Sequence, residues 1–368
     1  MNNDELNFYK RQINLPNFGL EGQEKLKNSK ALVIGAGGLG SPAILYLSAA
    51  GIGKIGVCDF DKVEITNLHR QIIFDYQDVG ETKTQSAKKK INKFNPLINI
   101  EEISESVSPD NVENIISGYD VVLDCTDNFA TKFLLHDACY LNKINLVQSS
   151  IYQFEGQLQV FRFAEDTGQG CYRCLWQNIP EEGCVGTCAD AGVLGVVPGI
   201  FGTLQALETI KILLNWDGLV WNESLIFDLL SLNSRKIRWK KNVNCPLCGD
   251  NKIIKQINPG AYNRMKDFEI SYKDVDLTKY KIVDIRESFE RVEEFLKDDS
   301  LKIEHIPYST LQNSLPNINN GDTYLFYCRS GRRTKELVGR LWKNNYKNTF
   351  SLKEGAEGIS MILDSNKK

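Results

Sequence analysis

Short apolar runs alternate with longer amphipathic segments along the first two thirds of the chain. Apolar runs of strand length lie at residues 31–34 and 54–58, and the segment between them carries apolar residues at helical spacing. Ser41 and Pro42 suit the start of that helix, with Ser41 as its cap and Pro42 in its first turn. Such alternation is typical of a parallel sheet covered by helices, and it predicts a βαβ unit over residues 30–61.

The same alternation continues downstream. Further strands are predicted at 97–103, 120–124, 145–149, 156–163 (antiparallel), 225–228 and 236–239, and helices at 85–94, 112–116, 131–141 and 199–214. After a polar stretch, strands at 281–285, 323–327 and 348–352 and a helix at 334–344 form a second α/β pattern. We therefore expect an α/β protein with a mainly parallel sheet in a domain at 1–249, a linker at 250–266 and a smaller domain at 267–368.

The composition is ordinary for a globular protein and narrows the possible partners. The 368 residues are 42% hydrophobic and 25% charged, and Lys+Arg 44 against Asp+Glu 47 gives a net charge of −3. This balance predicts no general affinity for nucleic acid or anionic membranes. No apolar run approaches the roughly 20 residues that a membrane span needs, and the N-terminus has no apolar signal region. We expect a cytoplasmic protein.

A glycine-rich turn follows the first predicted strand. Residues Gly35 to Gly40 have the spacing G-x-G-x-x-G, and the glycines let backbone N–H groups approach a phosphate at the positive end of the next helix. Asp59 ends the second strand about 20 positions later, where a carboxylate accepts hydrogen bonds from ribose hydroxyls. The pattern indicates a nucleotide site. NAD is the default ligand and ATP the rarer one, and the turn alone does not decide between them.

Polar side chains gather where the predicted strands end. Those that follow the second and fourth strands are Thr66, Asn67, Arg70, Lys83, Asp127 and Asn128. In a parallel sheet these strand ends open on one crevice, so the side chains are candidates for the nucleotide site. Asp127 could instead cap the helix that follows it. Arg11, taken alone, is most simply a solvated surface charge.

Two C-x2-C pairs stand out among the ten cysteines. Cys171 with Cys174 and Cys245 with Cys248 supply the four thiolates of a closed tetrahedral zinc site, which would be structural because no coordination position is left open. The alternative is a redox-active pair. In a reducing compartment two such pairs favour zinc over disulfides.

Cys328 is the strongest candidate nucleophile. It follows a predicted buried strand and begins the loop Cys-Arg-Ser-Gly-Arg-Arg, and a cationic loop of this kind favours a thiolate and equally a persulfide anion. An inert buried cysteine would not account for the three arginines. A phosphatase-type loop is one residue longer, so this loop is too short for phosphate. Cys188, in a glycine-rich segment, is nucleophilic if that segment is exposed, although a packing role is almost as well supported.

Together these motifs resemble the MoeB/ThiF family of ubiquitin-activating-like adenylyltransferases, fused to a rhodanese-like domain. From about residue 8 to 249 the resemblance rests on RQI, GAGGLGSP, DFDKVEITNLHRQ, LDCTDN, CYRC, TCADAGVLG and CPLCG. From about residue 268 it rests on VDIRE and CRSGRRT. The order of the two parts is similar to that of the adenylyltransferase/sulfurtransferases that serve molybdopterin synthase.

The resemblance implies ATP rather than NAD as the nucleotide. It implies that Gly38 and Asp59 hold the nucleotide and that Asp127 holds Mg²⁺. The residues it implies as phosphate contacts are Asn67, Arg70 and Lys83, and the expected nucleotide site is completed by Thr66 and Asn128. In such enzymes the arginine that matches Arg11 reaches across a homodimer to the partner's ATP, so the resemblance implies a catalytic role for this residue.

The resemblance also implies the reaction. Family members adenylate the C-terminal glycine of a small ubiquitin-fold sulfur carrier, and Cys328 would then deliver sulfur as a persulfide to give a thiocarboxylate. Cys188 matches a cysteine that links covalently to the carrier in some relatives. The implied sulfur donor is a cysteine desulfurase or thiosulfate, and a molybdopterin-synthase subunit is the favoured carrier over thiamine-pathway and tRNA-thiolation carriers.

Two functions of other classes remain as alternatives. An NAD-dependent oxidoreductase would need a hydride-transfer constellation, which we do not find, and would leave Arg70, Lys83 and Asp127 without a role. A non-catalytic scaffold would only dock a ubiquitin-fold partner. The C-terminal segment LKEGAEGISMIL also lacks the Trp that often ends a rhodanese-like domain.

Overall fold

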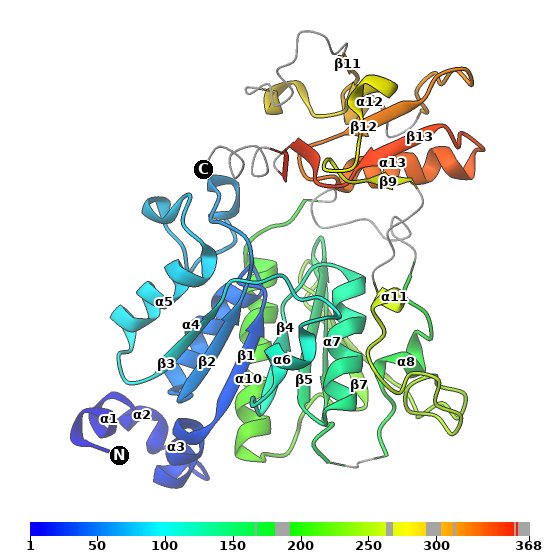
Figure 1. The fold of residues 1–368 in the computed structure, drawn as a ribbon. Helices are drawn as coiled ribbons and strands as arrows, with labels where there is room; N and C mark the ends of the chain where they lie inside the picture. Colours follow the sequence, from blue (N-terminus) through cyan, green and yellow to red (C-terminus); the bar gives the residue numbers. More distant parts are fainter. Residues whose placement is uncertain are drawn as a thin grey trace. The chain divides into compact units, whose positions relative to one another are not determined.

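The chain folds into two compact units. The computed structural model describes residues 1–165, 168–180, 192–262, 268–291, 303–311, 314–356 and 358–359. The two units are Met1–Asn263 and Arg264–Lys368, and each is built around a sheet of its own (Figure 1).

The first unit contains an eight-stranded sheet with the strand order β3-β2-β1-β4-β5-β6-β7-β8. The strands are β1 (Lys30–Ile34), β2 (Lys54–Cys58), β3 (Asn99–Ile103), β4 (Val121–Asp124), β5 (Asn145–Tyr152), β6 (Glu155–Phe161), β7 (Glu223–Asp228) and β8 (Asn233–Arg238). The first five strands in this order, from β3 through β2, β1 and β4 to β5, are parallel to one another. Each of β6, β7 and β8 pairs antiparallel with the strand before it. The mainly parallel sheet and the antiparallel direction of β6 confirm the predicted fold class.

The order of the parallel strands places a crevice at their carboxyl ends. β1 pairs with β2 on one side and with β4 on the other, so the connections that leave β1 and β4 run in opposite directions. The turn after β1 touches the chain after β4, because a Cβ on Gly35 would lie 2.9 Å from the carbonyl oxygen of Cys125. The glycine turn therefore lies at the switch point of the sheet.

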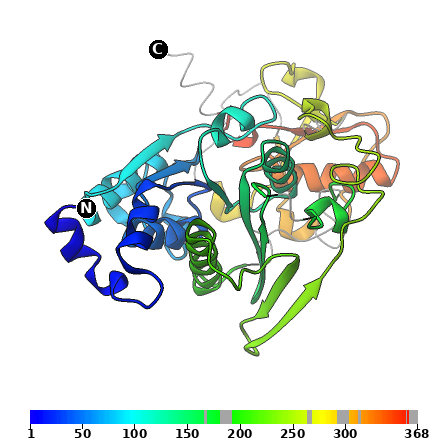
Figure 2. The ribbon, with the colours of Figure 1, turned by 90° about the horizontal axis from the view of Figure 1, so that it is seen from below.

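Helices cover both faces of this sheet. The helices on one face are α3 (Gly19–Asn28), α4 (Gly40–Ala50), α5 (Lys83–Phe94) and α10 (Val196–Leu214), and those on the other are α6 (Val112–Ile116) and α7 (Phe129–Leu141). Successive strand residues point to opposite faces, so Val33 joins the first cluster and Leu32 the second. Figure 2 shows α10 and α7 nearly end-on, on either side of the strands.

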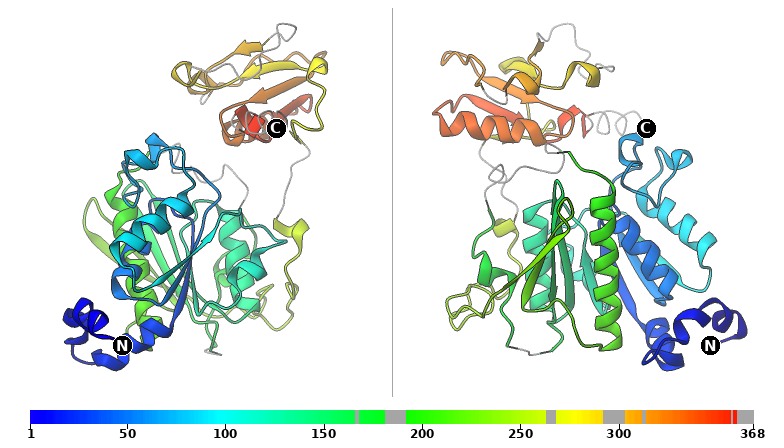
Figure 3. Two further views of the ribbon diagram at one scale, coloured as in Figure 1. Left: turned by 60° about the vertical axis from the view of Figure 1, so that its left-hand side comes forward. Right: turned by 180° about the vertical axis from the view of Figure 1, so that it is seen from behind.

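Helix α10 is longer and more apolar than we expected of any segment of this chain. Its 19 residues reach a mean hydropathy of 1.3, and in the part of the chain that the structure describes it is the one helix long and apolar enough, by length and composition, to cross a membrane. The prediction that no apolar run approaches this length is therefore wrong. Half of the helix window is buried, and Phe201 and Ala206 belong to the core cluster of the first unit. The helix runs along one face of the sheet (Figure 3).

The second unit is a smaller parallel α/β fold. Its five strands follow the order β11-β10-β12-β13-β9 and all neighbours are parallel. The elements are β9 (Glu269–Ile270), β10 (Lys281–Asp284), β11 (Ile303–His305), α12 (Tyr308–Leu311), β12 (Tyr324–Tyr327), α13 (Arg332–Lys343) and β13 (Thr349–Leu352). Phe326 and Leu325, neighbours on the central strand β12, lie in separate clusters on its two faces.

The start of the chain is helical, which the sequence pattern did not predict. It forms α1 (Asn3–Phe8), α2 (Lys10–Ile13) and α3, and α1 begins with a reciprocal capping box between Asn2 and Glu5. The prediction that Ser41 caps α4 is wrong. The helix begins one residue earlier, at Gly40, and the Ser41 hydroxyl instead donates to the carbonyl oxygen of Ala36 (3.4 Å).

Much of the segment for which we predict a linker packs on the first unit. It includes the short helix α11 (Pro259–Tyr262), and Tyr262 is only 7% exposed. The backbone N–H groups of Ile253 and Ile254 both donate to the carbonyl oxygen of Pro246, at 2.8 and 2.9 Å. Residues 250–262 are therefore held against the domain that precedes them.

Candidate active site

The glycine turn after β1 has a shape that only glycine permits at two positions. Gly35 has a φ of +93° and its N–H donates to the carbonyl oxygen of Cys58 (2.8 Å). A Cβ on Gly40 would lie 1.9 Å from the carbonyl oxygen of Gly35, closer than any side chain can come. The chain therefore turns tightly into α4, with the N-terminal end of the helix at the crevice, where it favours an anion.

Asp59 anchors the turn from the end of β2. Its Oδ2 accepts the N–H of Ala36 (2.8 Å), and its Oδ1 accepts the N–H of Asp61 (2.9 Å). Burial raises the pKa of Asp59, while the nearby Lys83 ammonium acts in the opposite direction. Each carboxylate oxygen has a second lone pair, so Asp59 can still accept a ribose hydroxyl at this edge.

Lys83 places a nearly buried ammonium group beside the carboxylates of Asp59 and Asp61. Its Nζ lies 2.9 Å from Asp61 Oδ2 and 3.6 Å from Asp59 Oδ1, and its side chain is 6% exposed. Lys83 is the first residue of α5, which begins two residues before the predicted helix start at Gln85. A buried cation beside the glycine turn suits phosphate binding.

The loop after β2 folds over the glycine turn. One Arg70 nitrogen donates to Asn67 Oδ1 (3.0 Å) and the other to the carbonyl oxygen of Thr66 (3.0 Å). The Cγ of Arg70 lies 3.6 Å from where a Cβ on Gly38 would be. The structure thus places Gly38, Asn67 and Arg70 close together. The Thr66 hydroxyl instead donates to Glu64 Oε2 (3.0 Å).

Asp127 and Asn128 follow β4 at the same edge of the sheet. The Asn128 side chain accepts the N–H of Thr131 (2.9 Å) and caps α7, so the helix cap that we considered for Asp127 is supplied by its neighbour. Asp127 is exposed. A carboxylate at this position suits Mg²⁺, which prefers oxygen ligands.

Arg11 lies at the opposite end of α4 from the turn. It is exposed on α2, and the neighbouring Gln12 donates through its side chain to the carbonyl oxygen of Ala50 (2.8 Å), at the C-terminal end of α4. The 11 residues of α4 span roughly 16 Å at about 1.5 Å per residue. Arg11 is therefore not part of the crevice of its own chain.

A buried polar network beneath the crevice escaped the sequence analysis. Lys132 Nζ lies 3.1 Å from Asp124 Oδ2 and donates to the carbonyl oxygen of Ser149 (2.6 Å), and Gln148 donates to the same Asp124 oxygen (2.7 Å). Asp124 is fully buried at the end of β4. The motif LDCTDN contains Asp124, but nothing in the sequence indicated that Lys132, near the start of α7, turns inward to pair with it.

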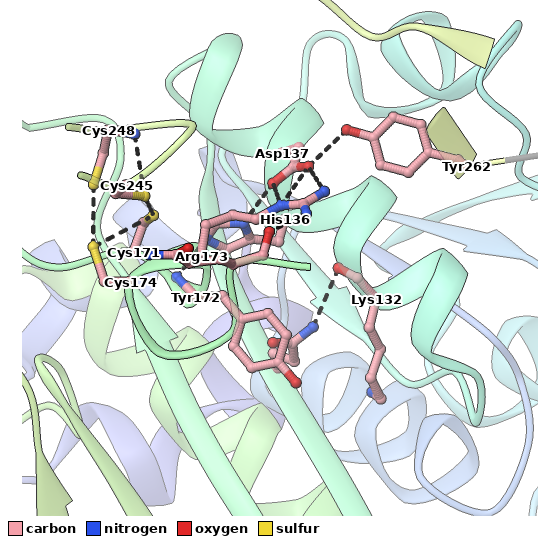
Figure 4. A network of polar contacts seen from close by, with 12 residues as sticks. Lys132, His136, Asp137, Cys171, Tyr172, Arg173, Cys174, Cys245, Cys248 and Tyr262 are labelled. Atoms are coloured by element: carbon pink, nitrogen blue, oxygen red, sulfur yellow. Dashed lines mark hydrogen bonds and ion pairs between the residues drawn. The ribbon is translucent and has the colours of Figure 1, made fainter. Parts of the chain in front are cut away.

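The two cysteine pairs of the first unit lie side by side (Figure 4). Cys171 Sγ lies 3.5 Å from Cys245 Sγ, Cys174 Sγ lies 3.3 Å from Cys248 Sγ, and all four sulfurs are within 4.8 Å of one another. Tetrahedral zinc with Zn–S bonds of about 2.3 Å needs sulfurs about 3.8 Å apart, so the donor set fits this metal. The N–H of Asn242 points at Cys174 Sγ (3.3 Å), as in sites that hold thiolates.

Cys328 lies at the end of β12 in the second unit and is fully buried. Its Sγ is 3.8 Å from Thr334 Oγ1, and its carbonyl oxygen accepts the N–H of Ala356 (2.9 Å). The predicted order of strand, loop and helix is confirmed. Of the three loop arginines, Arg333 makes two 2.7 Å hydrogen bonds to Glu290, and despite its burial both Glu290 and the Cys328 thiol raise its pKa. Cys188 lies outside the described residues.

Two known protein families match successive parts of the chain. Residues 9–247 match the ThiF family. The chain belongs to the ThiF family. Residues 269–361 match the rhodanese-like domain, so a rhodanese-like domain follows the ThiF domain. Membership of this family supports ATP rather than NAD as the nucleotide.

Some named relatives match about 70% of the chain and another matches nearly all of it. The sulfur carrier protein adenylyltransferase of Thermus thermophilus is 42% identical over 69% of this chain and 94% of its own. The adenylyltransferase and sulfurtransferase UBA4 of Candida albicans is 36% identical over 98% of this chain and 89% of its own. The adenylyltransferase and sulfurtransferase MOCS3 of Aedes aegypti is 45% identical over 70% of this chain, and the match spans only 58% of that protein.

Solved structures share the fold of the first unit. The crystal structure of E. coli MccB with ATP superposes with a TM-score of 0.59 at 21% identity, over 68% of this chain and 75% of that one. At this level of identity the likeness shows the fold.

Proposed function

We propose that this chain adenylates the C-terminal glycine of a small ubiquitin-fold sulfur carrier and then converts that glycine to a thiocarboxylate. The observation that supports adenylation most directly is the convergence of Gly38, Asp59, Arg70 and Lys83 at one edge of the sheet. Membership of the ThiF family and the names of the relatives point to the same chemistry.

Different residues of the crevice bind different parts of ATP in the proposed adenylation. Asp59 accepts ribose hydroxyls, Arg70 and Lys83 pair with phosphate oxygens, and Asp127 would hold Mg²⁺, which neutralises phosphate charge when bound. The carrier carboxylate attacks the α-phosphorus of ATP, the bond to the β-phosphate oxygen breaks, and pyrophosphate leaves. Fixed cations at this position stabilise the charge that develops on the phosphates.

Cys328 supplies the sulfur. Its thiolate first attacks the sulfane sulfur of a donor, either the persulfide of a cysteine desulfurase or thiosulfate. Cys328 becomes a persulfide as the S–S bond of the donor breaks and the desulfurase thiolate or sulfite leaves. The terminal sulfur attacks the carbonyl carbon of the acyl-adenylate, AMP leaves, and an acyl disulfide joins the carrier to Cys328. A thiol reductant then supplies two electrons to break the S–S bond, which releases the thiocarboxylate and the Cys328 thiol.

The remaining proposals concern the carrier, the metal and the assembly. The favoured carrier is the small subunit of molybdopterin synthase, and thiamine-pathway and tRNA-thiolation carriers are the alternatives. Zinc occupies the four-cysteine site, the enzyme acts in the cytoplasm as a homodimer, and Arg11 of each chain serves the partner's site. The position of Arg11 outside its own crevice supports this last assignment.

Carrier-dependent exchange of labelled pyrophosphate into ATP tests the proposal. Each of the three candidate carriers is added in turn with Mg²⁺ and ATP, and we expect exchange with one of them, none without a carrier and none when the carrier lacks its last glycine. An enzyme that binds NAD and shows no exchange with any carrier would contradict the proposal.

A further inference from the structure

One buried carboxylate, that of Asp137 on α7, joins two other segments of the first unit to this helix (Figure 4). Arg173 donates to both Asp137 oxygens at 2.6–3.2 Å, His136 Nδ1 lies 3.0 Å from Oδ1, and the Tyr262 hydroxyl donates to Oδ2 (2.6 Å). Asp137 and His136 are fully buried, and Arg173 is 5% exposed. A charge buried this deeply is stable only while its partners remain in place.

The first of these segments is the Cys171–Cys174 pair. Arg173 lies between the two cysteines, on α8 (Tyr172–Leu175), and the N–H of Tyr172 donates to His136 Nε2 (2.9 Å). His136 Nε2 is thus an acceptor and Nδ1 carries the proton donated to Asp137. The cysteine site and α7 are therefore joined through hydrogen bonds on both sides of the Asp137 carboxylate.

The second segment is the short helix α11, near the end of the first unit. Tyr262 closes α11 and is the last described residue before Phe268, where the description of the second unit begins. Its hydroxyl bond to Asp137 spans 125 residues of sequence. Hydrophobic packing of the Tyr262 ring with the α7 cluster accompanies this bond.

We propose that the bond from Tyr262 to Asp137 is a clasp that fixes the point from which the chain departs toward the sulfur-donating unit. Because Arg173, which lies between two of the cysteines, and Tyr262 both donate to Asp137, the cysteine site helps to hold Tyr262 in place. Tyr262 is then a positioning residue for sulfur transfer, with no part in adenylation. This inference rests on the proposed function, because it needs Cys328 to deliver sulfur to the carrier.

The expected size of the effect follows from tether length. If the clasp opens, the next backbone held on the first unit is that of Ile254, and the chain before Phe268 grows from residues 263–267 to residues 255–267. Scaling the effective concentration with roughly the −3/2 power of that number of residues gives an upper limit of about fourfold on the decrease.

The test uses Tyr262→Phe in the full chain, which keeps the ring and removes only the hydroxyl. We expect carrier-dependent pyrophosphate exchange at the wild-type rate, thiocarboxylate formation slowed by up to about fourfold, and faster amide hydrogen exchange in peptides from residues 250–262. Tyr119→Phe is the matched control, because it removes a hydroxyl that donates to the Glu101 carboxylate elsewhere in the same unit. The control should change neither sulfur transfer nor exchange in residues 250–262.

Unchanged hydrogen exchange and an unchanged rate of sulfur transfer in Tyr262→Phe would overturn the inference. Removal of the metal with a chelator should also speed amide hydrogen exchange in residues 250–262. If the exchange rates there do not change after chelation, the cysteine site does not help to hold Tyr262. If the wild-type enzyme itself makes no thiocarboxylate, the proposed function fails, whereas the exchange data still decide whether the clasp exists.

Discussion

At the scale of single residues, the crevice combines a tight glycine turn with paired charges of opposite sign. Glycine is required at Gly35 by a left-handed backbone and at Gly40 by the approach of a carbonyl oxygen. Asp59 and Lys83 are both nearly buried, and each lowers the cost of burying the other. These residues leave the positive end of α4 open to an anion.

We expect Lys83→Met to lower kcat/KM for adenylation by about 10²-fold or more, as is typical when a cation that stabilises transition-state charge is lost. Lys89→Met is the control, because Lys89 lies on the same helix but pairs with Glu81 on the exposed surface. Carrier-dependent pyrophosphate exchange is the measurement. Equal activities of the two variants would remove Lys83 from the site.

The residues that the sequence could predict are those with a local signature. The glycine turn and Asp59 follow directly from strand, turn and strand in order. The inward direction of Lys132 depends on the partner Asp124, which is on a separate strand, and no local pattern encodes it. The pairing of Arg333 with Glu290, 43 residues away in sequence, was equally hidden.

At the scale of elements, two short turns and one helix hold the edge of the first unit. The turns bring four cysteine sulfurs within metal-binding distance, and α7 passes beside them with His136 and Asp137. The spacing of the cysteines made this site predictable. The contribution of α7 was not, because no local pattern shows which partners the buried polar residues of an apolar helix will meet.

We expect one zinc ion per chain and a lower melting temperature in Cys171→Ser, since a closed metal site contributes directly to folding. Elemental analysis and thermal melts with and without chelator are the measurements. Cys58→Ala, a buried cysteine away from the site, should keep its zinc. Absence of zinc from the wild-type protein, with melting unaffected by the chelator, would contradict the assignment.

The stability of the first unit should depend on pH through Asp137. Burial alone would raise the pKa of Asp137, but hydrogen bonds from His136 and Arg173 hold it below its ordinary value of 3.8. Its stabilising contribution is therefore complete above that ordinary value and is lost as the pH falls through the lower folded-state pKa. We expect Asp137→Asn to destabilise by about 3–5 kcal/mol at neutral pH, with the difference shrinking below about pH 4 in urea denaturation. A difference that stays constant down to pH 2 would contradict this.

At the scale of the whole molecule, two independent sheets carry two chemistries. Periodicity was sufficient to predict both α/β units, because buried parallel strands produce continuous apolar runs. It missed α1 and α2, which are short and polar, and it gave no reason for Arg11 to matter within one chain. The resemblance implies that role, and in the structure Arg11 lies away from the crevice of its own chain.

A mixture of two inactive variants tests the shared site. Arg11→Ala and Lys83→Met chains should each be inactive in adenylation as homodimers, whereas random pairing in an equal mixture should restore about one quarter of the wild-type activity per chain. Half of the dimers are then mixed, and one site in each mixed dimer is intact. No recovery after subunit exchange, verified by native mass spectrometry, would show that Arg11 does not act across a dimer.

The most direct test of the whole account is the mass of the carrier after reaction with ATP, Mg²⁺, a sulfur donor and a thiol reductant. With the wild-type enzyme we predict a carrier in which one oxygen of the terminal glycine is replaced by sulfur. With Cys328→Ser we predict adenylated carrier and no sulfur gain. A thiocarboxylate formed at the normal yield by Cys328→Ser, or a carrier left unmodified by the wild-type enzyme, would contradict the account.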